Sequence, residues 1–224
     1  NVAIGSGAMY GNSGNSTGSN NVAVGVSALN VNRAGASNVA VGVGALAANT
    51  TASNNTAIGA GAASGTTTGA SNVAIGVNAL DLNVGGAYNV AIGHLCNDTA
   101  TGSSNNVAMG YNALSAANGS NNTAIGHQCM KNSTSTYSTA MGYNALTGAG
   151  GDYACAFGMN AAAANTANAT IAMGYGAATA NTSGARNIAI GYEAYDSSDT
   201  ENDNIAIGYE AMTANTAGGT QNVA

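Results

Sequence analysis

A five-residue pattern of alternating small and bulky apolar residues recurs along the whole chain. It first appears as Asn1-Val2-Ala3-Ile4-Gly5, and its closing glycine then returns every 16 or 17 residues after a first gap of 20. The thirteen glycines are residues 5, 25, 42, 59, 76, 93, 110, 126, 142, 158, 174, 191 and 208. A fixed short period of this kind is typical of solenoids. The sequence therefore predicts an all-β parallel β-solenoid with 16–17-residue coils.

Each coil can be numbered from its glycine, which we place at position 0. Position −2 is alanine in all thirteen coils, positions −3 and −1 are mostly bulky and apolar, and position −4 is asparagine in ten coils. We take the −4, −2 and 0 residues as the structural repeat, represented by Asn1, Ala3 and Gly5, by Asn72, Ala74 and Gly76, by Asn106, Ala108 and Gly110, and by Asn204, Ala206 and Gly208.

The positions from −4 to 0 predict one strand per coil, because they combine β-branched and small residues in strict alternation. The glycine allows a sharp turn or a close backbone approach. We expect a second short strand at +2 to +4, and a stack of asparagine side chains from coil to coil. Ser138, Ala154 and Thr170 interrupt this stack, so those three coils should be the most irregular.

The predicted strand is apolar on both faces, bulky on one and uniformly alanine on the other. A strand of this kind is normally buried on both faces. One face must pack inside the coil and the other against a further surface. The alanines indicate either a very narrow coil interior or a place where three chains meet. We therefore expect a parallel homotrimer, and the competing interpretation is a lone flat solenoid with an exposed alanine face.

Charge and composition narrow the classes of partner. The 224 residues include nine acidic and three basic residues, 33 glycines and no proline, with a net charge of −6. Nucleic acid is not an expected partner, since no basic patch is available to replace counterions. Membrane insertion is not expected either, because no apolar run reaches the length of a spanning helix. The chain starts and stops within a repeat, so we interpret residues 1–224 as a single array of about 13 coils from a longer fibre.

The Asn-x-Ala-Ile-Gly-x-x-Ala unit resembles the head repeat of YadA-like trimeric autotransporter adhesins. Gly-Tyr-Asn-Ala-Leu, at residues 110–114 and 142–146, is similar to repeats of bacteriophage tail fibres. The resemblance spans every coil. It implies a left-handed, trimeric β-roll on the outside of a cell or virion, with adhesion or receptor binding as its activity and no catalysis. The adhesin repeat is shorter than this one, which favours the phage fibre.

Two His-x-Cys pairs are the weak metal candidates. His94 and Cys96 share their positions, +1 and +3, with His127 and Cys129. Zinc needs three or four ligands, and no carboxylate accompanies either pair. We expect the histidines to be interface side chains and the cysteines to be small buried residues, with no metal or other cofactor bound.

An acidic connector carries Asp196, Asp199, Glu201 and Asp203. It could offer oxygen ligands to calcium. It lacks the regular spacing of a calcium loop, so we interpret it as a solvated loop.

The leading hypothesis is a structural and adhesive segment of an extracellular trimeric fibre, most simply a phage tail fibre that takes part in host attachment. Its partners would be further copies of itself and a host-surface glycan or protein, contacted through the variable connectors. The alternatives are a bacterial trimeric adhesin head and a self-assembling extracellular filament. An ice-binding surface ranks below these, because threonine forms no continuous row.

Overall fold

The computed structural model describes residues 1–11, 17–99, 101–116, 119–148, 150–196, 200–213 and 219–224. These residues form thirteen three-residue strands and no helix. The strands are β1 (Val2–Ile4), β2 (Val22–Val24), β3 (Val39–Val41), β4 (Thr56–Ile58), β5 (Val73–Ile75), β6 (Val90–Ile92), β7 (Val107–Met109), β8 (Thr123–Ile125), β9 (Thr139–Met141), β10 (Cys155–Phe157), β11 (Ile171–Met173), β12 (Ile188–Ile190) and β13 (Ile205–Ile207). Every strand occupies positions −3 to −1 of its coil.

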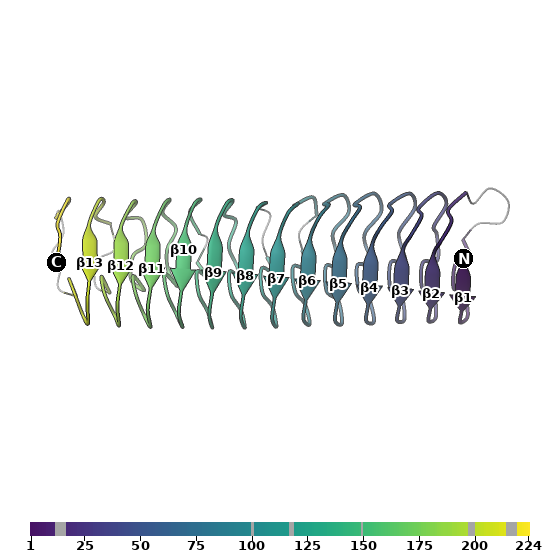
Figure 1. Ribbon diagram of the computed structural model, residues 1–224, viewed down its shortest axis with the longest axis horizontal. Helices are drawn as coiled ribbons and strands as arrows, with labels where there is room; N and C mark the ends of the chain where they lie inside the picture. The colour runs from purple at the N-terminus through teal and green to yellow at the C-terminus, as the bar shows by residue number, and fades with distance from the viewer. Residues whose placement is uncertain (12–16, 100, 117–118, 149, 197–199, 214–218) are drawn as a thin grey trace. The chain divides into compact units, whose positions relative to one another are not determined.

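The chain divides into two compact units, Asn1–Asn118 with β1–β7 and Gly119–Ala224 with β8–β13. Within each unit, every strand pairs in parallel with the strands of the neighbouring coils (Figure 1). The alanines of paired strands lie opposite one another, as Ala23 does with Ala40 and Ala124 with Ala140. This arrangement confirms the parallel β-solenoid and its 16–17-residue coils.

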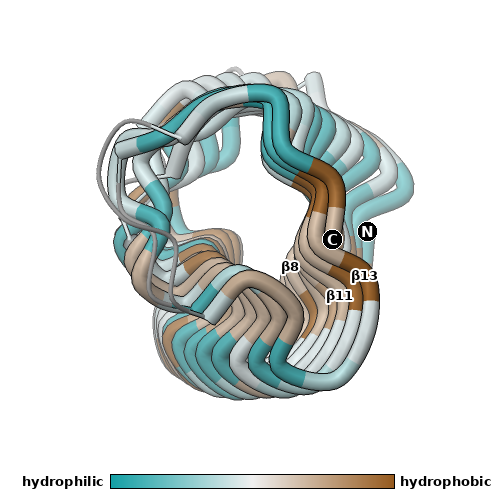
Figure 2. The backbone as a smooth tube through the Cα atoms, turned by 90° about the vertical axis from the view of Figure 1, so that its left-hand side faces the viewer, coloured by the Kyte–Doolittle hydropathy of each residue, from teal (hydrophilic) through white to brown (hydrophobic). Residues whose placement is uncertain are grey.

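The alanine row lies inside the coil. Ala74, Ala108 and Ala206 are completely buried, whereas the residues on either side of each alanine are half-buried or exposed. Ala3, in the edge strand β1, is exposed. Viewed along a unit, the most hydrophobic residues gather on the side of the ring that carries the strands (Figure 2). Of the two explanations for the alanines, the narrow coil interior is therefore the right one.

The glycine at position 0 is required by its backbone. Gly25 has a φ of +136°, and a Cβ atom built on it would lie 2.4 Å from the carbonyl oxygen of Gly42 in the next coil. A side chain there would be strained by the positive φ and would clash with the neighbouring backbone. The expected close approach of backbone to backbone is thus confirmed.

The prediction of a second short strand at +2 to +4 is wrong, because turns occupy these positions. Ser27 and Leu29, at +2 and +4, have φ values of 56° and 52°. Their amides still donate hydrogen bonds to adjacent coils, Ser27 to the carbonyl of Ser6 and Leu29 to that of Ala45. Residues in the left-handed conformation therefore keep the backbone hydrogen bonds between coils, although the backbone here is not extended. The Leu29 side chain points into the core, where it is completely buried.

The asparagines at −4 form a buried ladder, but it differs from a simple stack of amides. The side-chain oxygen of Asn55 accepts the backbone N–H of Asn72 at 2.8 Å, and the side-chain nitrogen of Asn72 donates to the carbonyl of Gly86 at 2.9 Å. Side-chain to side-chain bonds occur as well, for example from Asn89 to Asn72 at 3.1 Å. The ladder therefore links backbone to side chain in successive coils and also fixes the connector.

The coils without asparagine at −4 retain regular strands. β9, β10 and β11 have the same length and pairing as the others, so the expected irregularity is absent from the strand pairing. The Ser138 N–H donates to the side-chain oxygen of Asn122, and the Ser138 hydroxyl oxygen accepts the N–H of Ala154. A hydroxyl at this position can thus replace the amide.

A second polar row, at position +7, fixes each connector. The asparagines of this row bond to backbone groups two or three residues ahead, as Asn83 does with both the N–H and the carbonyl of Gly86. The other members that do so are Asn32, Asn49, Asn165 and Asn181.

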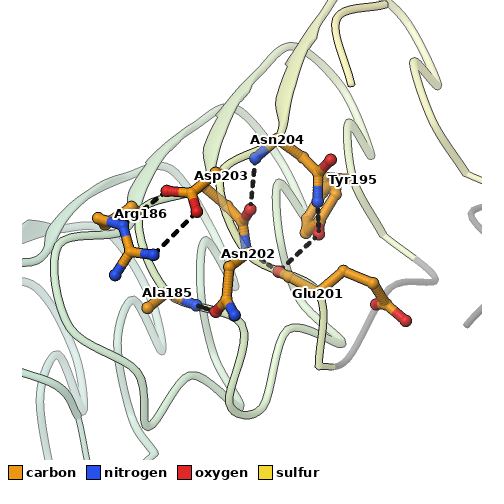
Figure 3. A network of polar contacts seen from close by, with 8 residues as sticks. Ala185, Arg186, Tyr195, Glu201, Asn202, Asp203 and Asn204 are labelled. Atoms are coloured by element: carbon orange, nitrogen blue, oxygen red, sulfur yellow. Dashed lines mark hydrogen bonds and ion pairs between the residues drawn. The ribbon is translucent and has the colours of Figure 1, made fainter. Parts of the chain in front are cut away.

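Tyr195 makes the equivalent bond in the coil of Gly191. Its buried hydroxyl donates to the carbonyl of Glu201 at 3.0 Å and accepts from the side chain of Asn204 at 2.9 Å (Figure 3). The aromatic ring lies at position +4, which is a leucine or methionine in most coils. One tyrosine therefore fills the core position and also satisfies the connector.

Candidate interaction face

Each unit presents one face built from three rows of side chains, at positions −3, −1 and +1. We call this surface the strand face. The period of two along the strand turns −3 and −1 outward when −4 and −2 point inward. At −1, side chains that are 36% to 42% exposed include those of Ile58, Ile75, Met109, Met141 and Met173. At +1, those that are 42% to 59% exposed include Val26, Val43, Val77, Tyr111, Tyr143, Met159, Tyr175 and Tyr192.

The strand face contains no aspartate, glutamate, lysine or arginine in any of its three rows. All twelve charged residues of the chain lie at other positions of the coil. Its polar members are threonines at −3, Ser6, the tyrosine hydroxyls and the two histidines. Large uncharged apolar surfaces are uncommon on proteins that act alone and usually mark a contact with another molecule.

Aromatic rings at +1 stack from coil to coil along the edge of the strand face. The ring centroids of Tyr175 and Tyr192 lie 5.0 Å apart, and those of Tyr192 and Tyr209 lie 5.3 Å apart. His127 stacks on Tyr143 with centroids 5.2 Å apart, and His94 lies 5.5 Å from Tyr111. The histidines therefore belong to the same row as the tyrosines.

The structure separates the histidines from the cysteines that were considered with them as metal ligands. His94 and His127 are exposed, whereas Cys96 and Cys129 are completely buried in the core. The intervening +2 residue has a positive φ, so the side chains at +1 and +3 do not share a face as they would in a strand. The described residues contain no group of three or more histidine, cysteine, aspartate or glutamate side chains placed to hold a metal ion.

The three cysteines are free thiols. Burial raises the pKa of both Cys96 and Cys129 to about 12. A thiol with so high a pKa is a poor nucleophile and a poor metal ligand, because both roles need the thiolate. These cysteines act as small core residues in a position that is otherwise alanine.

The acidic connector is only partly solvated. Glu201 is buried, and its carbonyl also accepts a bond of 2.6 Å from the side chain of Asn187. Asp203 makes a two-pronged bond to Arg186, with distances of 2.6 and 2.8 Å (Figure 3). Asp199 lies outside the described residues.

The chain matches no protein-family model, no curated protein and no solved structure to which it was compared. Nowhere in the described residues does a helix have the length and apolarity needed to cross a bilayer.

Sequence reasoning identified the rows of the strand face but missed three other features. These are the asparagine row at +7, the left-handed residues at +2 and +4, and the role of Tyr195. A signal for the +7 row was present, since asparagine recurs seven residues after the glycine in seven of the thirteen coils. It was hidden by the abundance of asparagine in the connectors around it.

Proposed function

We propose that this chain is a structural and adhesive segment of an extracellular trimeric fibre, a phage tail fibre that takes part in host attachment. The observation that supports the proposal is the strand face, which is apolar, free of formal charge and exposed in each unit. Burying apolar surface stabilises an assembly by about 25 cal/mol per Å². The strand face would supply this stabilisation when copies of the chain associate.

Further copies of the same chain are the partner that fits the repeat best. The side chains of the strand face recur with the spacing of the coils, and an identical parallel chain offers the same spacing. Every coil would then meet an equivalent coil, and no charged group would need to be buried. Most soluble homo-oligomers have closed cyclic symmetry, so a closed ring of identical chains is the expected assembly.

The bend at each glycine favours a ring of three over a pair. The backbone bends at Gly191, between Ile190 on the strand and Tyr192 at +1, and we propose that this bend divides the strand face into two facets. A surface with two facets can contact two neighbours, and each member of a cyclic trimer has two. We propose the left-handed coil sense together with this trimer, on the resemblance to adhesin and tail-fibre repeats.

The attachment role places the trimer on the outside of a virion, with the connectors facing the host. The connectors carry the variation in length and charge from coil to coil, as binding loops on a rigid scaffold do. A glycan or protein of the host surface would be their partner.

Immunogold electron microscopy tests this proposal. Antibodies raised against the chain should decorate fibres that project from phage particles, and the purified chain should reduce phage adsorption to host cells. Labelling of a bacterial cell surface would instead support an adhesin head. Labelling of open polymers without particles would support a self-assembling filament, and either result would overturn the phage assignment.

A further inference from the structure

We infer that Arg186 of one copy forms an ion pair with Glu193 of the neighbouring copy, at the seam between two strand faces. This inference rests on the proposed trimer and adds the contact that would fix its rotational order.

Arg186 and Glu193 stand at opposite edges of the strand face in the coil of Gly191. Arg186 is at −5, just before the buried Asn187, and Glu193 is at +2, just after Tyr192. Six residues lie between them, including the strand β12 (Ile188–Ile190) and the bend at Gly191. The two side chains therefore bracket the face formed by Ile188, Ile190 and Tyr192.

Both side chains are held at these edges by contacts within the chain. The side chain of Arg186 is 60% exposed and bonds to Asp203, which occupies the same −5 position one coil later (Figure 3). Its guanidinium has further donors that this pair does not use. The Glu193 carboxylate accepts a hydrogen bond from Tyr192, which raises the pKa of the tyrosine. A donor-rich cation and a positioned carboxylate thus lie at the two edges.

Ring symmetry determines which residues meet. In a closed cyclic assembly of parallel chains, equivalent coils lie at the same height, because any stagger would produce an open helix instead of a ring. The +2 edge of one strand face then adjoins the −5 edge of the next face in the same coil. In the coil of Gly191, this places Glu193 beside Arg186 of the neighbour.

The charges of the C-terminal unit support this pairing. Glu193, Asp203 and Glu210 of this unit are acidic, and Arg186 pairs with Asp203 within the chain. In the next coil, the same seam would place Asp203 near Glu210 of the neighbour. Arg186 would therefore offset the repulsion between acidic side chains both in its own coil and in the next one. Charge complementarity of this kind sets specificity and orientation in interfaces.

A charge-swap experiment tests the inference. All proteins carry Asp203→Asn, which removes the pair within the chain, and circular dichroism confirms that each is folded. The variants are Arg186→Glu, Glu193→Arg and the double swap. Sedimentation over a range of protein concentrations gives the midpoint for dissociation of the trimer. Each single swap should shift the midpoint to higher concentration by about tenfold or more, because like charges then meet across the seam.

The double swap decides the result. Recovery of the parent midpoint in the double variant supports the inference, since the pair is restored with its signs exchanged. If the double variant dissociates at least as readily as the single variants, the inferred ion pair is wrong. The proposed function still stands in that case if the parent protein, which carries Asp203→Asn alone, is a trimer. If the parent protein sediments as a folded monomer, the proposed trimer is contradicted, and there is no contact between copies in which the ion pair could form.

Discussion

Asn38 donates its backbone N–H to the side-chain oxygen of Asn21, one coil earlier, at a distance of 2.9 Å. Both residues are buried beside the alanine row. The same bond recurs between successive coils, so a row of side chains continues the hydrogen bonding of the strands beyond their three residues. The interior of each coil is therefore polar where the asparagines lie and apolar where the closely packed alanines lie.

The first prediction concerns this ladder. Asn72→Ala removes the acceptor of the Asn89 N–H and leaves that buried donor without its partner. An unsatisfied buried group costs about 1–3 kcal/mol, so the free energy of unfolding should fall by about that amount. Asn54→Ala is the matched control, because Asn54 is exposed at −5 and Ala169 occupies the same position with a similar φ. Equal losses in chemical denaturation would contradict the ladder.

The second prediction concerns the alanine row. Ala108→Phe places a large ring in a fully buried position, and overpacking of a core costs about 1–3 kcal/mol or more. We expect a strong fall in melting temperature. Met109→Phe, on the adjacent outward position, should be near neutral, since Phe157 stands at the same position of another coil. A comparable loss in both variants would mean that the inner and outer faces are wrongly assigned.

The third prediction concerns a buried amide in the apolar core. Asn97 is completely buried at +4, and neither amide atom has a hydrogen-bond partner among the described residues. Leu80 and Leu114 hold the same position one coil before and one coil after it, with similar φ values. Asn97→Leu should therefore raise the free energy of unfolding, by about 1–3 kcal/mol.

The reverse change provides the control for Asn97. Leu114→Asn would introduce the same unsatisfied amide into a coil that lacks it, and should lower the free energy of unfolding. A stabilising effect of Leu114→Asn, or a destabilising effect of Asn97→Leu, would show that the amide has a role that its surroundings do not reveal.

A residue predicts structure well when few backbone conformations and few environments suit it. Ala108 and Gly110 identified the strand and its tight turn, because alanine at every −2 and glycine at every 0 leave few interpretations. They did not reveal which strand face is inside, since alanine fits both a narrow interior and a close contact between chains. That question was decided by the ring that the whole coil forms.

The turn after the strand was mispredicted for a physical reason. Leucine rarely adopts a positive φ, so Leu29 favoured a strand over the left-handed conformation that it has. The bonds between coils stabilise this conformation, and such bonds depend on residues 16 or 17 positions away. Tyr195 was equally unpredictable, because its hydroxyl replaces an asparagine of another position.

The fourth prediction concerns pH. Burial raises the pKa of Asp98, and the nearby Asp81 carboxylate raises it further, while His94 lowers it. A carboxyl group whose pKa is raised by folding binds its proton more tightly in the folded state. Its contribution to stability is therefore greatest in acid and falls as the pH rises through its folded pKa. Asp98→Asn should increase stability more at pH 7 than at pH 4.

Denaturation at the two pH values checks this sign. Asp81→Asn is the control, since it removes the neighbouring charge and should give a smaller change in the same direction. An Asp98→Asn variant that stabilises the protein more at pH 4 than at pH 7 would contradict the account of this site.

Further copies of the chain cover the strand face of each unit in the assembly that we propose. Sedimentation velocity of the purified, folded protein tests this assembly. We expect a species of about three times the chain mass of 21.4 kDa, with tyrosines of the +1 row shielded from solvent. A folded monomer of 21.4 kDa at all concentrations tested, with those tyrosines exposed, would contradict it.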